Sequence, residues 1–103
     1  MNDYRVDFES MDWEEPMPGV RHKIVVQNAK RLRLVEYFQS MEPHWCSRGH
    51  VGMILEGQFE IRYDACTETY RPGDGVLIPS GEDHRHMAVA LTDSVRAVFV
   101  EEA

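Results

Sequence analysis

The chain has 103 residues, of which 43% are hydrophobic and 28% charged, a balance typical of one folded domain rather than a disordered chain. Its formal net charge of −7 predicts an acidic surface that repels phosphate backbones and anionic lipids, so neither nucleic acid nor membrane is expected as a partner. No apolar run reaches the ~18 residues of a membrane span, and the first residues lack the order of a signal peptide, so we expect a cytoplasmic protein whose two cysteines are thiols.

An acidic segment opens the chain. Residues 1–20 carry a cluster of carboxylates interspersed with Met11, Trp13 and Met17. The favoured interpretation is a solvated N-terminal arm in front of a single barrel domain at residues 21–103. The alternative is an arm that packs on a second subunit through its three large apolar side chains.

From residue 24 onward, short β-like runs alternate with turn residues. Glu56-Gly57 suits a hairpin turn, and the segments 71–74 and 78–81 carry Pro and Gly where type II and type I turns place them. No 3.6-residue period is sustained over a helical length, so the pattern predicts an all-β fold of antiparallel strands. The predicted strands cover residues 24–27, 31–38, 51–55, 58–63, 75–78, 84–91 and 95–101.

Most of the histidines gather in two segments. His44, Cys46 and His50 lie in one, and His84 and His86 lie in the other. Within each segment these positions share parity, and side chains of the same parity point to the same face of a strand. Two strands can therefore aim imidazoles and a thiolate at one interior point. These are ligands that zinc, iron, cobalt and nickel accept.

The second of these segments also resembles a known motif. The run from Gly73 to His84 has glycine, proline, glycine and histidine at the spacing of the second motif of the cupin superfamily. Residues 54–57 are similar to the end of the first cupin motif. The resemblance covers about residues 30–100, and it implies a small antiparallel double-stranded β-helix, the jelly-roll or cupin barrel.

The same resemblance assigns metal ligands. Counted back from Gly57, the first motif places His44 on its first histidine, Cys46 on its second and His50 on its glutamate, and the second motif supplies His84. The implied cofactor is one divalent transition metal, with zinc or iron foremost and nickel, cobalt or manganese as alternatives. A thiolate disfavours magnesium and calcium. Cys46 as a small buried hydrophobe is the open alternative.

Two further residues lie beside the expected ligands. His86 and Arg48 are candidates for contacts with the ligands or with a substrate, and a merely buried or solvated His86 is the alternative. His22 is expected on the surface.

The implied function is a metal-binding barrel that binds or acts on a small molecule. If it is an enzyme, it is a metal-dependent oxygenase, isomerase or lyase. The alternative is a non-catalytic module that binds or senses a small ligand around a structural zinc, whose four protein ligands leave no open position. A barrel without metal is the third interpretation. Because small cupins usually pair through their sheets, the resemblance also implies a homodimer.

Overall fold

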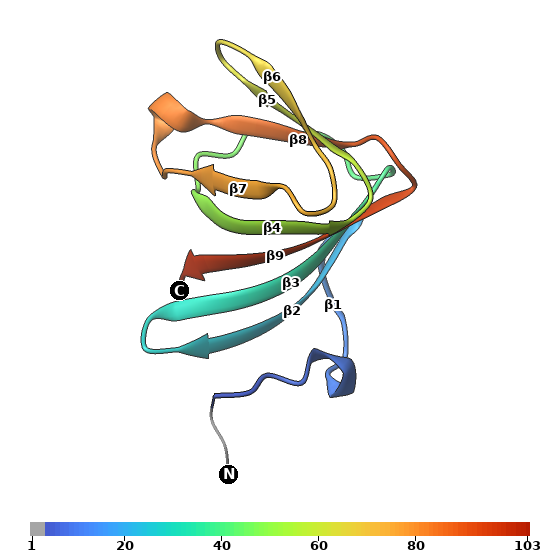
Figure 1. Cartoon of the computed structure of the whole chain (residues 1–103), viewed down its shortest axis with the longest axis vertical. Coiled ribbons are helices and arrows are strands. Elements are labelled where there is room, and N and C mark those ends of the chain that lie inside the picture. The colour runs from blue at the N-terminus through green and yellow to red at the C-terminus, as the bar shows by residue number, and fades with distance from the viewer. Residues whose placement is uncertain (1–3) are drawn as a thin grey trace.

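The computed structural model describes residues 4–103, and these are almost entirely β (Figure 1). Its only helices are two one-turn 3-10 helices, η1(Phe8–Ser10) and η2(Glu82–His84), so no helix of the described residues is long and apolar enough to cross a membrane. The strands are β1(Glu14–Met17), β2(Val20–Gln27), β3(Lys30–Phe38), β4(His50–Glu56), β5(Phe59–Tyr63), β6(Thr67–Tyr70), β7(Gly75–Ile78), β8(His86–Ala90) and β9(Ser94–Glu102).

Two sheets face each other and together make a barrel (Figure 1). The larger sheet has the strand order β1-β2-β3-β9-β4-β7, and the smaller has the order β6-β5-β8. Every neighbouring pair in both sheets is antiparallel. The predicted antiparallel jelly-roll barrel is confirmed.

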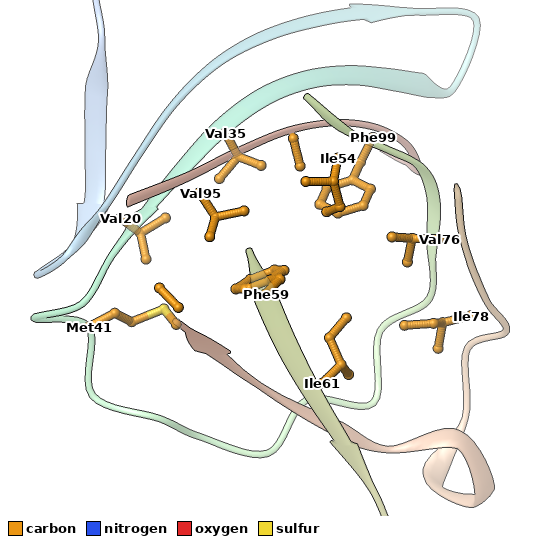
Figure 2. Packing of buried hydrophobic residues seen from close by; sticks show 12 residues of the cluster. Val20, Val35, Met41, Ile54, Phe59, Ile61, Val76, Ile78, Val95 and Phe99 are labelled. Carbon is orange, nitrogen blue, oxygen red and sulfur yellow. The ribbon is translucent and has the colours of Figure 1, made fainter. Parts of the chain in front are cut away.

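Apolar side chains from the inner faces of both sheets fill the middle of the barrel (Figure 2). Phe59 of the smaller sheet and Ile54 and Phe99 of the larger one are among the largest fully buried side chains. The Tyr37 ring packs on Phe59 with 4.8 Å between centroids. Burying a side chain of this size contributes roughly 1.5–3 kcal/mol, so this cluster holds the two sheets together.

The alternation along β3 is inverted relative to the usual expectation that leucines point into a core. Arg31 pairs with Glu101 and Arg33 with the buried Phe99, and both arginines point into the barrel. Leu32 and Leu34 alternate with them and lie on the outer face of the sheet. Because strand side chains alternate strictly, the leucines are the outward set and the arginines line an interior cavity.

The acidic N-terminal segment packs on its own chain from residue 8 onward, where the Phe8 carbonyl accepts a hydrogen bond from the Lys23 ammonium at 2.6 Å. Residues 14–17 form β1, which pairs with β2 at the edge of the larger sheet. The guanidinium of Arg21 lies 4.3 Å from the centroid of the Trp13 ring, and the Lys23 ammonium lies 4.6 Å from it. Trp13 is thus anchored on its own subunit through cation–π contacts. The start of the expected arm, residues 1–3, lies outside the described residues.

Two local differences from the predicted strands affect the site. Residues 67–70, which lie outside all the predicted strands, form β6. The strand expected from residue 84 begins instead at His86, because residues 82–84 close a 3-10 turn in which the His84 backbone NH donates to the carbonyl of Gly81 at 3.0 Å. This turn separates His84 from His86 and gives the two side chains different surroundings.

Gly52 allows β4 and β9 to lie close together, and this generates a stability prediction. A Cβ added at Gly52 would lie 1.9 Å from the carbonyl oxygen of Val98 and 2.9 Å from the Cα of Phe99. Gly52→Ala is expected to lower the free energy of unfolding by about 3 kcal/mol, because backbone atoms rather than a flexible side chain must move. Urea denaturation measures this.

Gly75→Ala is the matched control. A Cβ there would meet only the Gly52 carbonyl oxygen, at the ordinary contact distance of 3.8 Å. Its effect is expected to stay within about 0.5 kcal/mol. Equal losses in the two variants would contradict the close approach of β4 and β9.

Candidate metal centre

Three side chains from separate parts of the chain converge at one end of the barrel. Cys46 lies in the segment between β3 and β4, while His50 begins β4 and His86 begins β8. A β-bridge fixes Cys46 against His86, with reciprocal backbone hydrogen bonds of 2.8 and 2.9 Å. One ligand atom from each of the three side chains lies within 4.8 Å of the other two. The fold therefore brings together a sulfur and two imidazoles without any local sequence motif that joins all three.

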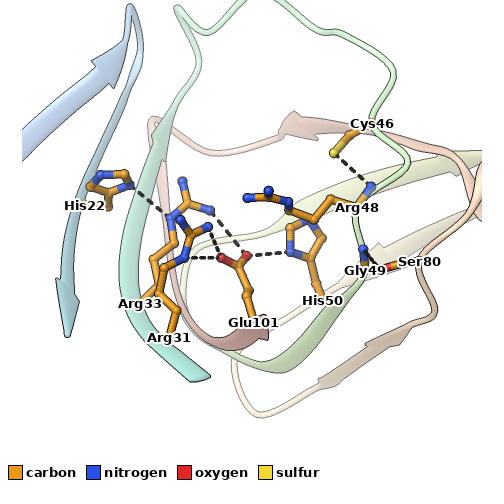
Figure 3. Close-up of polar contacts among 9 residues, drawn as sticks. All are labelled: His22, Arg31, Arg33, Cys46, Arg48, Gly49, His50, Ser80 and Glu101. Atoms are coloured by element: carbon orange, nitrogen blue, oxygen red, sulfur yellow. Dashed lines mark hydrogen bonds and ion pairs between the residues drawn. The ribbon is translucent and has the colours of Figure 1, made fainter. Parts of the chain in front are cut away.

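His50 is oriented by a buried carboxylate. Its Nδ1 donates to Oε2 of Glu101 at 2.8 Å, which leaves Nε2 as the free ring nitrogen (Figure 3). A carboxylate behind an imidazole fixes the ring and its tautomer, as is common behind metal-ligating histidines. Burial lowers the pKa of His50, but the neighbouring Cys46 and Glu101 raise it more, so the net direction is upward.

Glu101 is itself held by two arginines. Arg31 Nε donates to its Oε1 at 3.1 Å, and Arg33 Nη1 lies 3.5 Å from its Oε2. The side chain of Glu101 is only 1% exposed. Burial raises the pKa of its carboxyl, but the hydrogen bonds from His50 and Arg31 outweigh burial and bring it to about 2. Glu101 is therefore a buried carboxylate at neutral pH.

His86 carries the atom that best tests whether this group fits a metal. Its residue is 3% exposed, and its Nδ1 donates to the His84 carbonyl at 3.1 Å. Its Nε2 is buried and has no hydrogen-bond partner among the described residues. A buried polar atom without a partner carries a desolvation cost of roughly 1–3 kcal/mol. A metal ion shared with Cys46 and His50 would remove that cost, so these residues fit a metal.

The Cys46 sulfur is in the form that binds metals. The imidazoles of His50 and then His86 lower the pKa of its thiol to about 5, against the opposing effect of burial. The backbone NH of Arg48 also donates to the sulfur, at 3.4 Å. At neutral pH Cys46 is a thiolate, which is the nucleophilic and metal-binding form.

The structure separates the other two residues predicted as ligands from this group. His44 is exposed, its Nδ1 donates to the Glu42 carbonyl at 3.3 Å, and it lines the same cavity without joining the three ligand atoms. His84 is exposed in η2 and lines a different pocket, beside Cys66. The structure thus brings Cys46 and His50 together with His86, in the place where the motif count expects His84.

A cavity of about 320 Å³ opens beside the three ligand atoms. Its wall contains Arg31, Arg33 and Arg48, and no aspartate or glutamate is among its lining residues. It also contains His22, which sequence reasoning placed on the surface. Burial, followed by the charge of Arg33, lowers the pKa of His22. The remaining lining residues are Pro16, Met17, Val20, Tyr37, Met41, His44, Cys46, His50, His86 and Ala88.

Several of these residues were missed from the sequence, although a signal was present. Arg31 and Arg33 stand two residues apart in a strand, which puts them on one face. Glu101 stands inside a strand that is otherwise apolar. A buried carboxylate requires cationic partners, and the two arginines supply them once β3 and β9 are paired.

Together these features define a jelly-roll barrel with a cavity suited to a metal and a small molecule. The family model described as Cupin domain matches residues 32–101, and the chain belongs to the cupin family. No match is found among curated proteins.

Solved structures share the fold. KdgF from Halomonas sp. is 26% identical, with 92% of this chain and 91% of that chain covered and a TM-score of 0.73. A sugar phosphate isomerase of the cupin superfamily from Silicibacter pomeroyi is 18% identical, with 96% and 75% covered and a TM-score of 0.74. A protein of unknown function from Rhizobium leguminosarum is 16% identical, with 99% and 98% covered and a TM-score of 0.79. The last two similarities concern the fold alone.

Removing the Glu101 charge is expected to destabilise the barrel in a pH-dependent way. The folded pKa of about 2 lies below the ordinary value of 4.5, so ionised Glu101 stabilises the fold fully above about pH 4.5, and this stabilisation is lost as pH falls toward 2. Glu101→Gln should lower the free energy of unfolding by about 3 kcal/mol at pH 7, because Arg31 and Arg33 lose their buried partner. The difference from wild type should shrink below pH 4.5. Urea titrations across this pH range measure both effects.

Glu102→Gln is the control for this variant. Glu102 is exposed and pairs only with the exposed Lys30, so its loss is expected to cost less than about 1 kcal/mol at every pH. A Glu101→Gln variant that matched this control would contradict a stabilising role for the buried carboxylate.

Proposed function

We propose that this cupin binds one divalent transition metal through Cys46, His50 and His86, and binds its small-molecule ligand beside that metal. The observation that carries the proposal is the buried, unpartnered Nε2 of His86 next to the Cys46 sulfur and the His50 ring. One thiolate and two imidazoles suit zinc or iron first, with cobalt, nickel and manganese as alternatives. His86 takes the ligand place expected for His84, and His44 lies on the cavity wall outside the three ligands.

The ligand count supports an open site. Three protein ligands with a fourth position open to the cavity are typical of catalytic zinc centres, whereas structural sites are closed by four. A metal held there would act as a Lewis acid on an oxygen of the bound molecule. Glu101 would keep the His50 ring in the orientation for ligation.

His22 favours an enzyme over a pure binding module. It accepts a hydrogen bond on Nδ1 from Arg33 Nε at 3.0 Å, which leaves its Nε2 free. Its lowered pKa keeps it neutral at pH 7, and because Nδ1 accepts the bond from Arg33, the ring proton lies on Nε2, which can donate a hydrogen bond to an oxygen of a bound molecule. This suits an isomerase or lyase. The alternative is a ligand-sensing module in which His44 closes a tetrahedral zinc, and a metal centre without solvent would favour it.

The metal proposal is tested on untagged protein by elemental mass spectrometry. The wild type is expected to hold about one metal per chain, and His86→Ala and Cys46→Ser are each expected to lose it, because each removes one ligand of a three-ligand site. Metal should also dissociate as pH falls, because protons compete for the Cys46 thiolate and the two imidazoles.

The chain offers a matched control for each variant. His84→Ala and Cys66→Ser change the same residue types outside the group and should retain the metal. Loss of metal in His84→Ala with retention in His86→Ala would overturn the ligand assignment. Absence of metal from wild type after incubation with zinc and with anaerobic iron would overturn the metal centre.

We also propose that a second copy of the chain covers the outer face of the larger sheet. The strand registers align Val25, Leu32, Val100, Val51 and Leu77 in one apolar row across five strands. Leu34, Val98 and Met53 form a parallel row beside it. Leu77 is 81% exposed and Val51 50%. Apolar rows of this kind complement their own copy in a two-fold interface, and none of these eight residues carries a charge.

Disrupting these rows is expected to change the mass in solution. Leu77→Glu together with Val51→Glu should convert a dimer to a monomer, because two like charges per copy would be buried at the interface. Light scattering coupled to size exclusion measures this. Val26→Glu, at a position 58% exposed and outside both rows, should leave the dimer intact. A monomeric wild type would contradict the proposal.

A further inference from the structure

We propose that the molecule bound in the cavity carries an oxyanion, a carboxylate or phosphate group, which is held by Arg31, Arg33 and Arg48 opposite the Cys46–His50–His86 group. This inference rests on the proposed function, since it names the class of ligand for that site. It adds an anion-binding side to the cavity that the metal ligands do not provide.

The charges on the cavity wall point to an anion. The chain as a whole is acidic, with a net charge of −7, yet three of its arginines line this one cavity and no aspartate or glutamate of residues 4–103 does. Glu101 behind the wall partly neutralises Arg31 and Arg33. Three guanidinium groups that line one half-enclosed cavity, only two of them paired with a carboxylate, repel one another, and a bound anion relieves that repulsion.

The hydrogen-bonding capacity of the arginines is not used up by the protein. Arg31 gives its Nε and Nη2 to Glu101, and no partner of its Nη1 is found among the described residues. The guanidinium of Arg48 has no hydrogen-bond or ion-pair partner at all in residues 4–103, since only its backbone NH is engaged, by the Cys46 sulfur. A guanidinium fork matches a carboxylate or phosphate with two parallel hydrogen bonds.

The positions of these groups suit one small molecule in contact with both sides. Arg31 and Arg33 extend inward from neighbouring inward positions of β3, and Arg48 extends from the segment before β4 across the His50 ring toward them (Figure 3). The Cys46 sulfur lies on the side of the cavity where β4 and β8 begin. An oxyanion at the arginines therefore leaves the rest of the ligand close to the proposed metal. A volume of about 320 Å³ suits a small metabolite and excludes a polymer.

Arg48 is the residue to change first. Arg31 and Arg33 hold buried Glu101, so their loss would disturb the fold, whereas the exposed Arg48 guanidinium makes no contact that the fold depends on.

Isothermal titration of the zinc-loaded full chain would compare lactate with neutral lactamide, and glycerol 3-phosphate with neutral glycerol. At least one anion is expected to bind about tenfold or more tightly than its neutral counterpart. Which pair shows the difference identifies carboxylate or phosphate. Arg48→Gln should weaken that binding about tenfold, because one guanidinium fork is lost.

The matched control is Arg62→Gln, since Arg62 is also exposed but pairs with Glu60 on β5, away from the cavity. It should bind the anion like wild type, and both variants should keep the wild-type metal content. No preference for anions in either pair, or equal binding by the two variants, would overturn the anion site. Anion binding that depends on Arg48 in a chain that takes up no metal would leave this inference standing and overturn the proposed metal centre. Full metal content without any preference for the anions would overturn this inference and leave the proposed metal centre standing.

Discussion

The buried carboxylate of Glu101 is the interaction on which the candidate site depends. It projects from β9 between β3 and β4, and it contacts two arginines of β3 on one side and His50 of β4 on the other. A carboxylate that is 1% exposed is stable there only because cationic and hydrogen-bonding partners surround it. One side chain therefore fixes both the imidazole that faces the proposed metal and the guanidinium groups that face the cavity.

The same inner sheet face serves as core at one end and as site at the other. Along β9, Val95, Ala97 and Phe99 are buried among apolar neighbours, and the next inward position is Glu101. Along β3 the inward positions nearest the same end are Arg31 and Arg33, at the start of the strand, and Val35 follows them toward the core. The apolar end is closed by packing against the smaller sheet. The polar end retains a cavity because its side chains are engaged in hydrogen bonds instead of filling the space.

Sequence reasoning predicted the barrel because turn residues and short β-rich runs recur throughout the chain, and because the run ending at His84 follows a family motif. Parity placed Cys46 and His50 on one face together with His44, and the motif count selected His84, whereas the structure brings Cys46 and His50 together with His86. The reason is local: η2 turns His84 outward, and the bridge with Cys46 then sets His86 as the first inward residue of β8. A one-turn 3-10 helix and a single β-bridge between distant segments leave no periodic pattern in the sequence, so neither could be predicted from it. Arg31 and Arg33 were missed for a different reason, since alternation alone does not reveal which face of a strand is inside.

The charged side chains of the site suit a bound cation and a bound anion together. A thiolate and two neutral imidazoles give the proposed metal ligands one negative charge, which a divalent cation exceeds. The three cavity arginines add positive charge, and Glu101 balances only part of it. In the half-enclosed cavity this surplus is costly when empty and favourable when an anion is bound. Burial, followed by the charge of Arg33, lowers the pKa of His22, which keeps that ring neutral. A ligand with an oxyanion and a second oxygen for the metal would thus complete the charge balance, while the Nε2–H of His22 remains available to donate a hydrogen bond to it.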